Sequence, residues 1–255
     1  MAGRETKFAV TQIGKPEAGR LHLVWGHGWG QSAAALAPMA ETLKPFASSS
    51  LIDFPGFGNS ANPPETWGTA DYADAVAEWM RQLSAAKFVW VGHSFGGRVG
   101  IQLSARHPDL VSGLVLIASA GLRRKRTFSE RLRLSLRRTA FKTARRFVRE
   151  DEQLERLRQK FGSSDYRSAG AMRPVFTRVV AEDLTEQAKA IQCPALLIYG
   201  TKDTDTPPEM GHRLNALIAR SELVLLDGFN HLSVLTAGRH QVVLRIRKFL
   251  EQLSR

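Results

Sequence analysis

The pattern of apolar and polar positions alternates between two kinds of segment along the chain. Short continuous apolar runs, such as 21–25 and 88–91, are typical of strands buried on both faces. Between them lie longer segments in which apolar residues recur at helical spacing. This alternation predicts an α/β fold with a mostly parallel sheet covered by helices on both faces. We expect strands at 8–13, 21–25, 50–54, 88–91, 114–118, 195–199 and 223–226, and helices at 33–43, 69–83, 208–218 and 241–253, with a further helix ending near Arg106.

One long segment interrupts the alternation. Residues 121–191 contain no strand pattern, are rich in helix-forming residues and break at 162–164. We therefore expect a helical insertion in the loop after the strand 114–118. This divides the chain into a first part of the core (1–120), the insertion (121–190) and a second part of the core (191–255).

The net charge of +12 is concentrated in that insertion. Twelve Lys and Arg lie between Arg123 and Arg149 with a single acid, Glu130, so this stretch carries +11 and the remainder about +1. A nearly neutral body argues against nucleic acid as a partner. At 100° per residue, 131–149 forms a helix with one apolar arc and one basic arc, and Arg133 and Arg137 fall among the apolar residues. Two interpretations remain open: a solvated basic face, or a docking surface for an acidic carrier or an anionic lipid surface.

The cysteine content and the apolar runs indicate the cellular compartment. Cys193 is the single cysteine, so no internal disulfide can form and no oxidising compartment is required. The first residues have no apolar core of the kind found in signal peptides, and no run reaches membrane-spanning length. We expect a cytoplasmic protein.

The candidate chemistry begins at a serine between a strand and a helix. The apolar run 88–91 is followed at once by Gly92-His93-Ser94-Phe95-Gly96, and a helical pattern begins three residues later. Glycines two positions before and after a serine allow the strand and helix to meet closely under the turn, which lifts the hydroxyl above the sheet. Ser94 is therefore the candidate nucleophile.

Five motifs in this order resemble the α/β-hydrolase superfamily: H-G-W-G (27–30), D-F-P-G-F-G-N-S (53–60), G-H-S-F-G-G (92–97), G-T-K-D (200–203) and G-F-N-H (228–231). The resemblance covers everything except the insertion. It implies a triad in which Ser94 is the nucleophile, Asp203 the acid and His231 the base.

The chemistry of a serine nucleophile requires the same three kinds of group. A serine hydroxyl is a weak nucleophile, so a neutral imidazole has to take its proton, and a carboxylate has to orient that imidazole. Asp205 is a second candidate for the acid, but the spacing to Pro207 favours Asp203. His93 is expected to pack rather than act as the base, and His27 and Asp53 to brace their loops. His107, His212 and His240 are expected at the surface.

Acyl transfer also needs donors for the developing oxyanion. The amide after the nucleophile, Phe95, is one candidate, and the resemblance assigns the other to the Trp29 amide, whose ring is expected to line the acyl pocket. It also implies that the insertion is a cap that roofs the site, so Arg133 and Arg137 are candidate substrate contacts.

These residues predict a serine carboxylesterase that forms an acyl-enzyme on Ser94 and uses no metal or cofactor. Its substrate would be a small-molecule or carrier-linked ester. Two alternatives remain. A C–C bond hydrolase acting on aromatic ring-cleavage products also uses a serine triad. A non-catalytic, ligand-binding member of the same fold is the other, and a fluorophosphonate probe would separate it from an enzyme.

Overall fold

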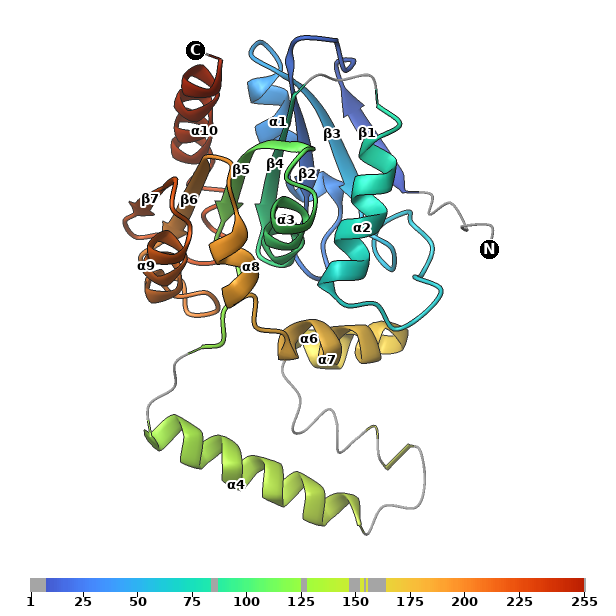
Figure 1. The fold of residues 1–255 in the computed structure, drawn as a ribbon. Coiled ribbons are helices and arrows are strands. Elements are labelled where there is room, and N and C mark those ends of the chain that lie inside the picture. Colours follow the sequence, from blue (N-terminus) through green and yellow to red (C-terminus); the bar gives the residue numbers. More distant parts are fainter. Residues whose placement is uncertain are drawn as a thin grey trace.

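The computed structural model describes residues 8–83, 87–124, 128–146, 152–153, 155 and 164–254. Its centre is a seven-stranded sheet in the order β1-β3-β2-β4-β5-β6-β7 (Figure 1). Among the strands of the described residues, only β1 and β3 pair in antiparallel fashion. The strands are β1 (Ala9–Ile13), β2 (Leu21–Gly26), β3 (Ser48–Asp53), β4 (Lys87–His93), β5 (Val111–Ile117), β6 (Ala195–Gly200) and β7 (Ser221–Leu226).

Helices cover both faces of this sheet and bury two apolar layers. Alternate side chains of β4 divide between the layers: Phe88 and Trp90 face one, and Val89 and Val91 face the other. The first layer packs against α2 (Thr69–Met80), α3 (Phe95–Arg106), α8 (Thr185–Ala190) and α9 (Pro208–Leu217), and the second against α1 (Ala37–Leu43) and α10 (Arg239–Leu253). The predicted doubly covered α/β sheet is confirmed.

Helices of 3 to 18 residues make up the described part of the stretch between β5 and β6. They are α4 (Phe128–Arg145), α6 (Ser164–Ser168), the 3₁₀ helix η2 (Gly170–Met172), α7 (Arg173–Ala181) and α8. Figure 1 shows α4 standing apart from the sheet, on the far side of α6 and α7. The two ends of this stretch meet, because the Leu184 amide donates to the Gly121 carbonyl at 2.9 Å. Glu182, beside it, accepts the Thr69 amide at 3.0 Å, which ties the end of α7 to the start of α2.

Several helix boundaries differ from the sequence prediction. The expected helix 33–43 is a 3₁₀ turn, η1 (Ala33–Ala35), followed by α1, which has Pro38 in its first turn. Proline lacks an amide proton, so a helix tolerates it only there. The expected helix 69–83 ends at Met80, and the expected helix 131–149 runs from Phe128 to Arg145. Residues 147–151 and 161–163, which include most of the predicted break, lie outside the described residues.

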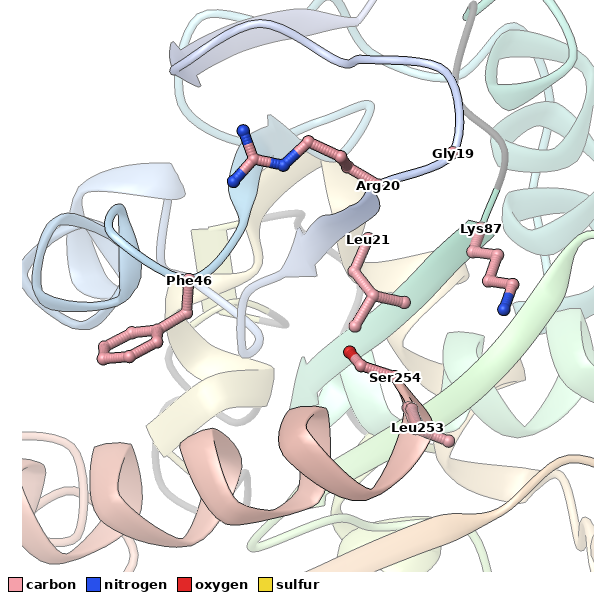
Figure 2. Close-up of a pocket in the computed structure, with 7 residues that line it drawn as sticks. All are labelled: Gly19, Arg20, Leu21, Phe46, Lys87, Leu253 and Ser254. Carbon is pink, nitrogen blue, oxygen red and sulfur yellow. The ribbon is translucent and has the colours of Figure 1, made fainter.

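A cavity of about 220 Å³ opens where strands begin (Figure 2). Leu21 and Lys87, the first residues of β2 and β4, line it together with Arg20 and Ser254. Parallel sheets place their reactive groups at the opposite, carboxyl ends of the strands. The cavity is therefore not the candidate site. No helix in the described part of the chain is long and apolar enough to cross a membrane.

Candidate active site

Ser94 occupies a strained turn between β4 and α3. Its backbone has φ 50° and ψ −103°, a region that side chains other than glycine rarely adopt. The Ser94 amide donates to the Ile117 carbonyl at the end of β5, which fixes the turn against the sheet. A Cβ on Gly92 would overlap the Gly96 carbonyl, and one on Gly96 would overlap the Gly26 carbonyl. The packing under the serine thus requires both glycines.

His231 and Asp203 extend from Ser94 in a continuous hydrogen-bonded chain. His231 Nε2 lies 3.0 Å from Ser94 Oγ, and His231 Nδ1 lies 2.8 Å from Asp203 Oδ2. The three residues follow the carboxyl ends of β4, β7 and β6, so the parallel sheet brings together groups that are far apart in sequence. The His231 side chain is 15% exposed and that of Asp203 is fully enclosed.

The surroundings of Asp203 hold it as a carboxylate. Its Oδ1 accepts the amides of Asp205 at 2.8 Å and Thr206 at 2.9 Å, and its Oδ2 accepts the Thr206 hydroxyl as well as His231. Burial acts to raise the pKa of Asp203, but the hydrogen bonds from His231 and Thr206 outweigh it and hold the pKa below its ordinary value. A charged Asp203 favours a proton on Nδ1, which leaves Nε2 free to accept one from Ser94.

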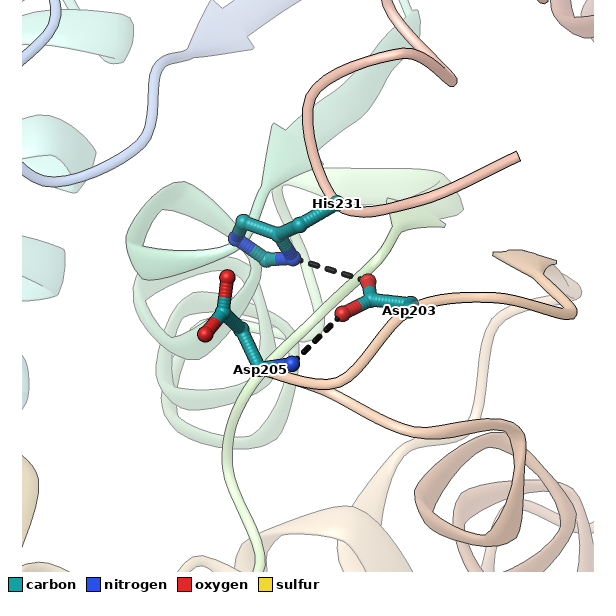
Figure 3. A group of neighbouring side chains, drawn as sticks. All are labelled: Asp203, Asp205 and His231. Carbon is teal, nitrogen blue, oxygen red and sulfur yellow. Dashed lines mark hydrogen bonds and ion pairs between the residues drawn. The ribbon is translucent and has the colours of Figure 1, made fainter.

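Figure 3 shows Asp205 next to Asp203, with its carboxylate near the end of the His231 ring that faces away from Asp203. Within the described residues, Asp203, Asp205 and His231 form the one group with the spacing of metal ligands, their ligand atoms all lying within 4.8 Å of each other. The separation of 2.8 Å between His231 Nδ1 and Asp203 Oδ2 is that of a direct hydrogen bond. Two ligand atoms on one tetrahedral metal, each about 2 Å from it, stand about 3.3 Å apart. In this arrangement His231 Nδ1 and Asp203 Oδ2 are joined by a hydrogen bond.

The loop after β2 faces Ser94 and carries the predicted oxyanion donor Trp29. His27 braces this loop, because its Nδ1 donates to the Gly28 carbonyl at 2.7 Å and its Nε2 accepts the Phe54 amide at 3.1 Å. Burial lowers the pKa of His27 to about 4, so the ring is neutral and suited to this pair of bonds. The amides of Trp29 and Phe95 donate to no other described residue. Both remain available for an oxygen near Ser94.

Aromatic rings surround Trp29 on the same edge of the sheet. Its ring makes edge contacts with Phe57 (centroids 4.8 Å apart), Phe95 (5.5 Å) and Phe176 (5.0 Å). Phe176 belongs to α7, so the helices between β5 and β6 contribute to the wall of the site.

The sequence model of the family described as "alpha/beta hydrolase fold" matches residues 22–160, more than half of the chain. The chain belongs to this family. The membership confirms the family predicted from the five motifs, and the sheet described above is the corresponding fold.

Two relatives and one solved structure illustrate the similarity. The chain is 25% identical over 245 residues to a pimeloyl-[acyl-carrier protein] methyl ester esterase of Aliivibrio salmonicida, covering 90% of this chain and 92% of that protein. A protein of the same name from Vibrio cholerae is 26% identical over 230 residues, with 84% and 88% covered. The fold of an esterase from Exiguobacterium antarcticum superposes with a TM-score of 0.73 at 20% identity, covering 96% of each chain.

The structure bears on three further residues named in the sequence predictions, Arg133, Arg137 and His107. Arg133 is exposed on α4, and no described contact links it to Ser94, so its role as a substrate contact stays a prediction. The side chain of Arg137 lies outside the described residues. His107, expected at the surface, is half-buried there, and its Nε2 lies 2.7 Å from the half-exposed carboxylate of Asp74 on α2.

Sequence reasoning missed two residues that contact the candidate triad and oxyanion loop. The Thr206 hydroxyl lies 2.9 Å from Asp203 Oδ2 and 3.2 Å from His231 Nδ1. Gln31 accepts the Gly28 amide at 2.9 Å and faces His93. Thr206 could have been anticipated from the sequence, because an Asp side chain often accepts hydrogen bonds from groups two or three residues further along the chain. Nothing in the sequence marked Gln31.

Proposed function

We propose that this α/β hydrolase cleaves carboxylic esters through an acyl-enzyme on Ser94. The observation that carries the proposal is the continuous chain from Ser94 Oγ through His231 to Asp203, with links of 3.0 and 2.8 Å. The ester cleavage for which the two relatives are named supports the same class of reaction.

Each half of the reaction moves one proton through His231. Ser94 Oγ attacks the ester carbonyl while His231 Nε2 takes its proton, and Asp203 stabilises the imidazolium. The oxyanion of the tetrahedral intermediate accepts the amides of Phe95 and Trp29, each such donor contributing ~3 kcal/mol. His231 returns the proton to the departing alcohol. Water then attacks the acyl-enzyme by the same route and releases the acid and free Ser94.

Two measurements test this reaction. A fluorophosphonate probe should label the wild type at Ser94 and leave Ser94→Ala unlabelled. A series of p-nitrophenyl esters from C2 to C12 should be hydrolysed by the wild type, with the chain-length preference reporting the depth of the aromatic lining around Trp29. A protein that neither reacts with the probe nor cleaves any ester would be a ligand-binding member of the fold. Cleavage of a ring-fission C–C bond in preference to every ester would favour the alternative hydrolase.

We further propose that the ester is presented on an acidic acyl carrier that docks at α4. Four cations of this helix and its end, Arg133, Lys142, Arg145 and Arg146, are exposed. Concentrated charge of one sign steers an oppositely charged partner, and screening by salt weakens the effect. The carrier-linked substrate named for the two relatives supports an acidic protein as the partner.

A matched pair of charge reversals tests the docking. Lys142→Glu with Arg145→Glu alters two exposed cations on α4, and Arg245→Glu with Lys248→Glu alters an equally spaced exposed pair on α10. The α4 variant should lose at least fivefold in kcat/KM for an acyl-carrier ester and stay within about twofold on p-nitrophenyl acetate. The α10 variant should change neither. Equal kcat/KM of the two variants on the carrier ester, with no dependence on salt, would contradict docking at α4.

A further inference from the structure

His93 lies at the junction of three segments that meet at Ser94. Its side chain is buried at the end of β4, next to the nucleophile, and its ring centre is 4.9 Å from that of His231. His93 Nε2 faces the backbone carbonyl of His231 at 3.2 Å. His93 Nδ1 faces Gln31 Oε1, also at 3.2 Å. One ring thus contacts both the loop of the candidate base and the loop after β2.

Gln31 continues this contact into the oxyanion loop. Its Oε1 accepts the Gly28 amide at 2.9 Å, and its own backbone amide donates to the Gly28 carbonyl at 3.2 Å. Trp29, the proposed oxyanion donor, lies between these two residues in the chain. A Cβ on Gly28 would stand 2.7 Å from both Gln31 Oε1 and His93 Nδ1, so the three groups are in close contact.

The positions of the protons decide which of these contacts is a hydrogen bond. The Gly28 N–H requires an oxygen at Gln31 Oε1, so both atoms that face the His93 ring, this one and the His231 carbonyl oxygen, are acceptors. Burial lowers the pKa of His93 to about 3, and the ring is therefore neutral with one N–H. That N–H donates to one of the two oxygens, and the ring packs against the other.

We propose that His93 and Gln31 are positioning residues that hold the oxyanion loop and the His231 loop at fixed positions relative to Ser94. The inference rests on the proposed reaction at Ser94 and adds the device that fixes its geometry. A displacement of about 1 Å at a reacting group can cost as much as 100-fold in rate. Loss of this link should therefore lower kcat more than it raises KM.

The experiment compares His93→Phe, Gln31→Leu and the double variant. Activity on p-nitrophenyl acetate is expressed per site labelled by fluorophosphonate, so that unfolded protein does not count. Each single change should lower kcat at least tenfold and leave KM within about threefold. Because both changes break one link, the double variant should lie within about threefold of the slower single variant. His22→Phe, which replaces a buried histidine whose ring bonds Ser48 and Ser50, is the control and should lower the melting temperature without lowering kcat per labelled site.

Two further variants test whether a side-chain amide can replace the N–H of His93. His93→Gln places an amide near the position of Nε2, and His93→Asn places one near Nδ1. One of the two should recover at least a third of the wild-type kcat, and its identity names the oxygen that receives the proton. If His93→Phe does not fold, Gln31→Leu, at a half-buried loop position, carries the test. Unchanged kcat per labelled site in Gln31→Leu, or a double variant whose loss is the product of the two single losses, would overturn the inference. Absence of labelling in the wild type would instead refute the reaction at Ser94.

Discussion

Replacement of Asp203 by asparagine should abolish most of the activity by moving a single proton. Oδ1 of Asp203 accepts two backbone amides, those of Asp205 and Thr206, and only an oxygen can satisfy them. The carbonyl oxygen of the introduced side chain would therefore occupy this position, and its NH₂ group would face His231 Nδ1. The opposite orientation would leave two amides against an NH₂ group, at about 1–3 kcal/mol for each unsatisfied group.

Thr206 does not oppose this orientation. Its hydroxyl lies 2.9 Å from the Ala118 carbonyl as well as from Asp203 Oδ2, so it can donate to Ala118 and accept from the new NH₂ group. His231 Nδ1 would then act as an acceptor and its proton would move to Nε2, 3.0 Å from Ser94 Oγ. An Nε2 that carries a proton cannot accept one from Ser94.

The expected loss in kcat is about 10⁴-fold, or ~5.5 kcal/mol, as for the same substitution in a serine-protease triad. It is measured with p-nitrophenyl butyrate on protein whose melting temperature shows that it is folded. Asp205→Asn is the matched control: it keeps the amide that bonds Asp203 and changes only an exposed carboxylate, so it should stay within a few-fold of wild type. An Asp203→Asn variant within tenfold of wild type, or a more damaging Asp205→Asn, would refute the reasoning.

Further predictions follow from the same groups. Ser94→Ala should fold normally and retain only trace esterase activity, and full activity would exclude the acyl-enzyme. Chelators should have no effect, and a loss that zinc restores would contradict a metal-free site. Burial lowers the pKa of His22 from 6.5 to about 4, so on acidification the unfolded chain takes up this proton before the folded protein does. Protonation of His22 should therefore lower the free energy of unfolding by about 2 kcal/mol between pH 7 and pH 5. Urea titrations of His22→Asn should show a smaller fall by that amount.

The fold was predictable because its strongest signals are local. A strand buried on both faces needs a continuous apolar run, and the run 88–91 lies wholly within β4. Helix ends were less predictable, since they depend on single groups: the Ala33 amide is bonded to Asp53 Oδ1 at 2.7 Å, a partner 20 residues away. Such a contact leaves no periodic pattern.

The candidate triad followed from motif order and general chemistry, and the structure adds contacts that the sequence could not supply. The bond of Gln31 to Gly28 spans one turn, but its contact with His93 spans 62 residues and exists only because the sheet places β2 beside β4. The position of α4 was also beyond the sequence. Its amphipathic pattern predicts a helix and does not say what, if anything, its apolar arc packs against.

The hydrogen bond between Leu184 and Gly121 closes the helical stretch between β5 and β6 into a loop with a fixed neck. Beyond this neck, α7 still packs into the core, where Val175 and Val179 are buried, whereas none of the described α4 side chains is buried. Because doubling the length of a flexible loop costs only about 0.6 kcal/mol, changes confined to α4 should disturb the core and Ser94 little. Evolution, or an engineer, could then recharge or replace α4 while the candidate triad stays in place.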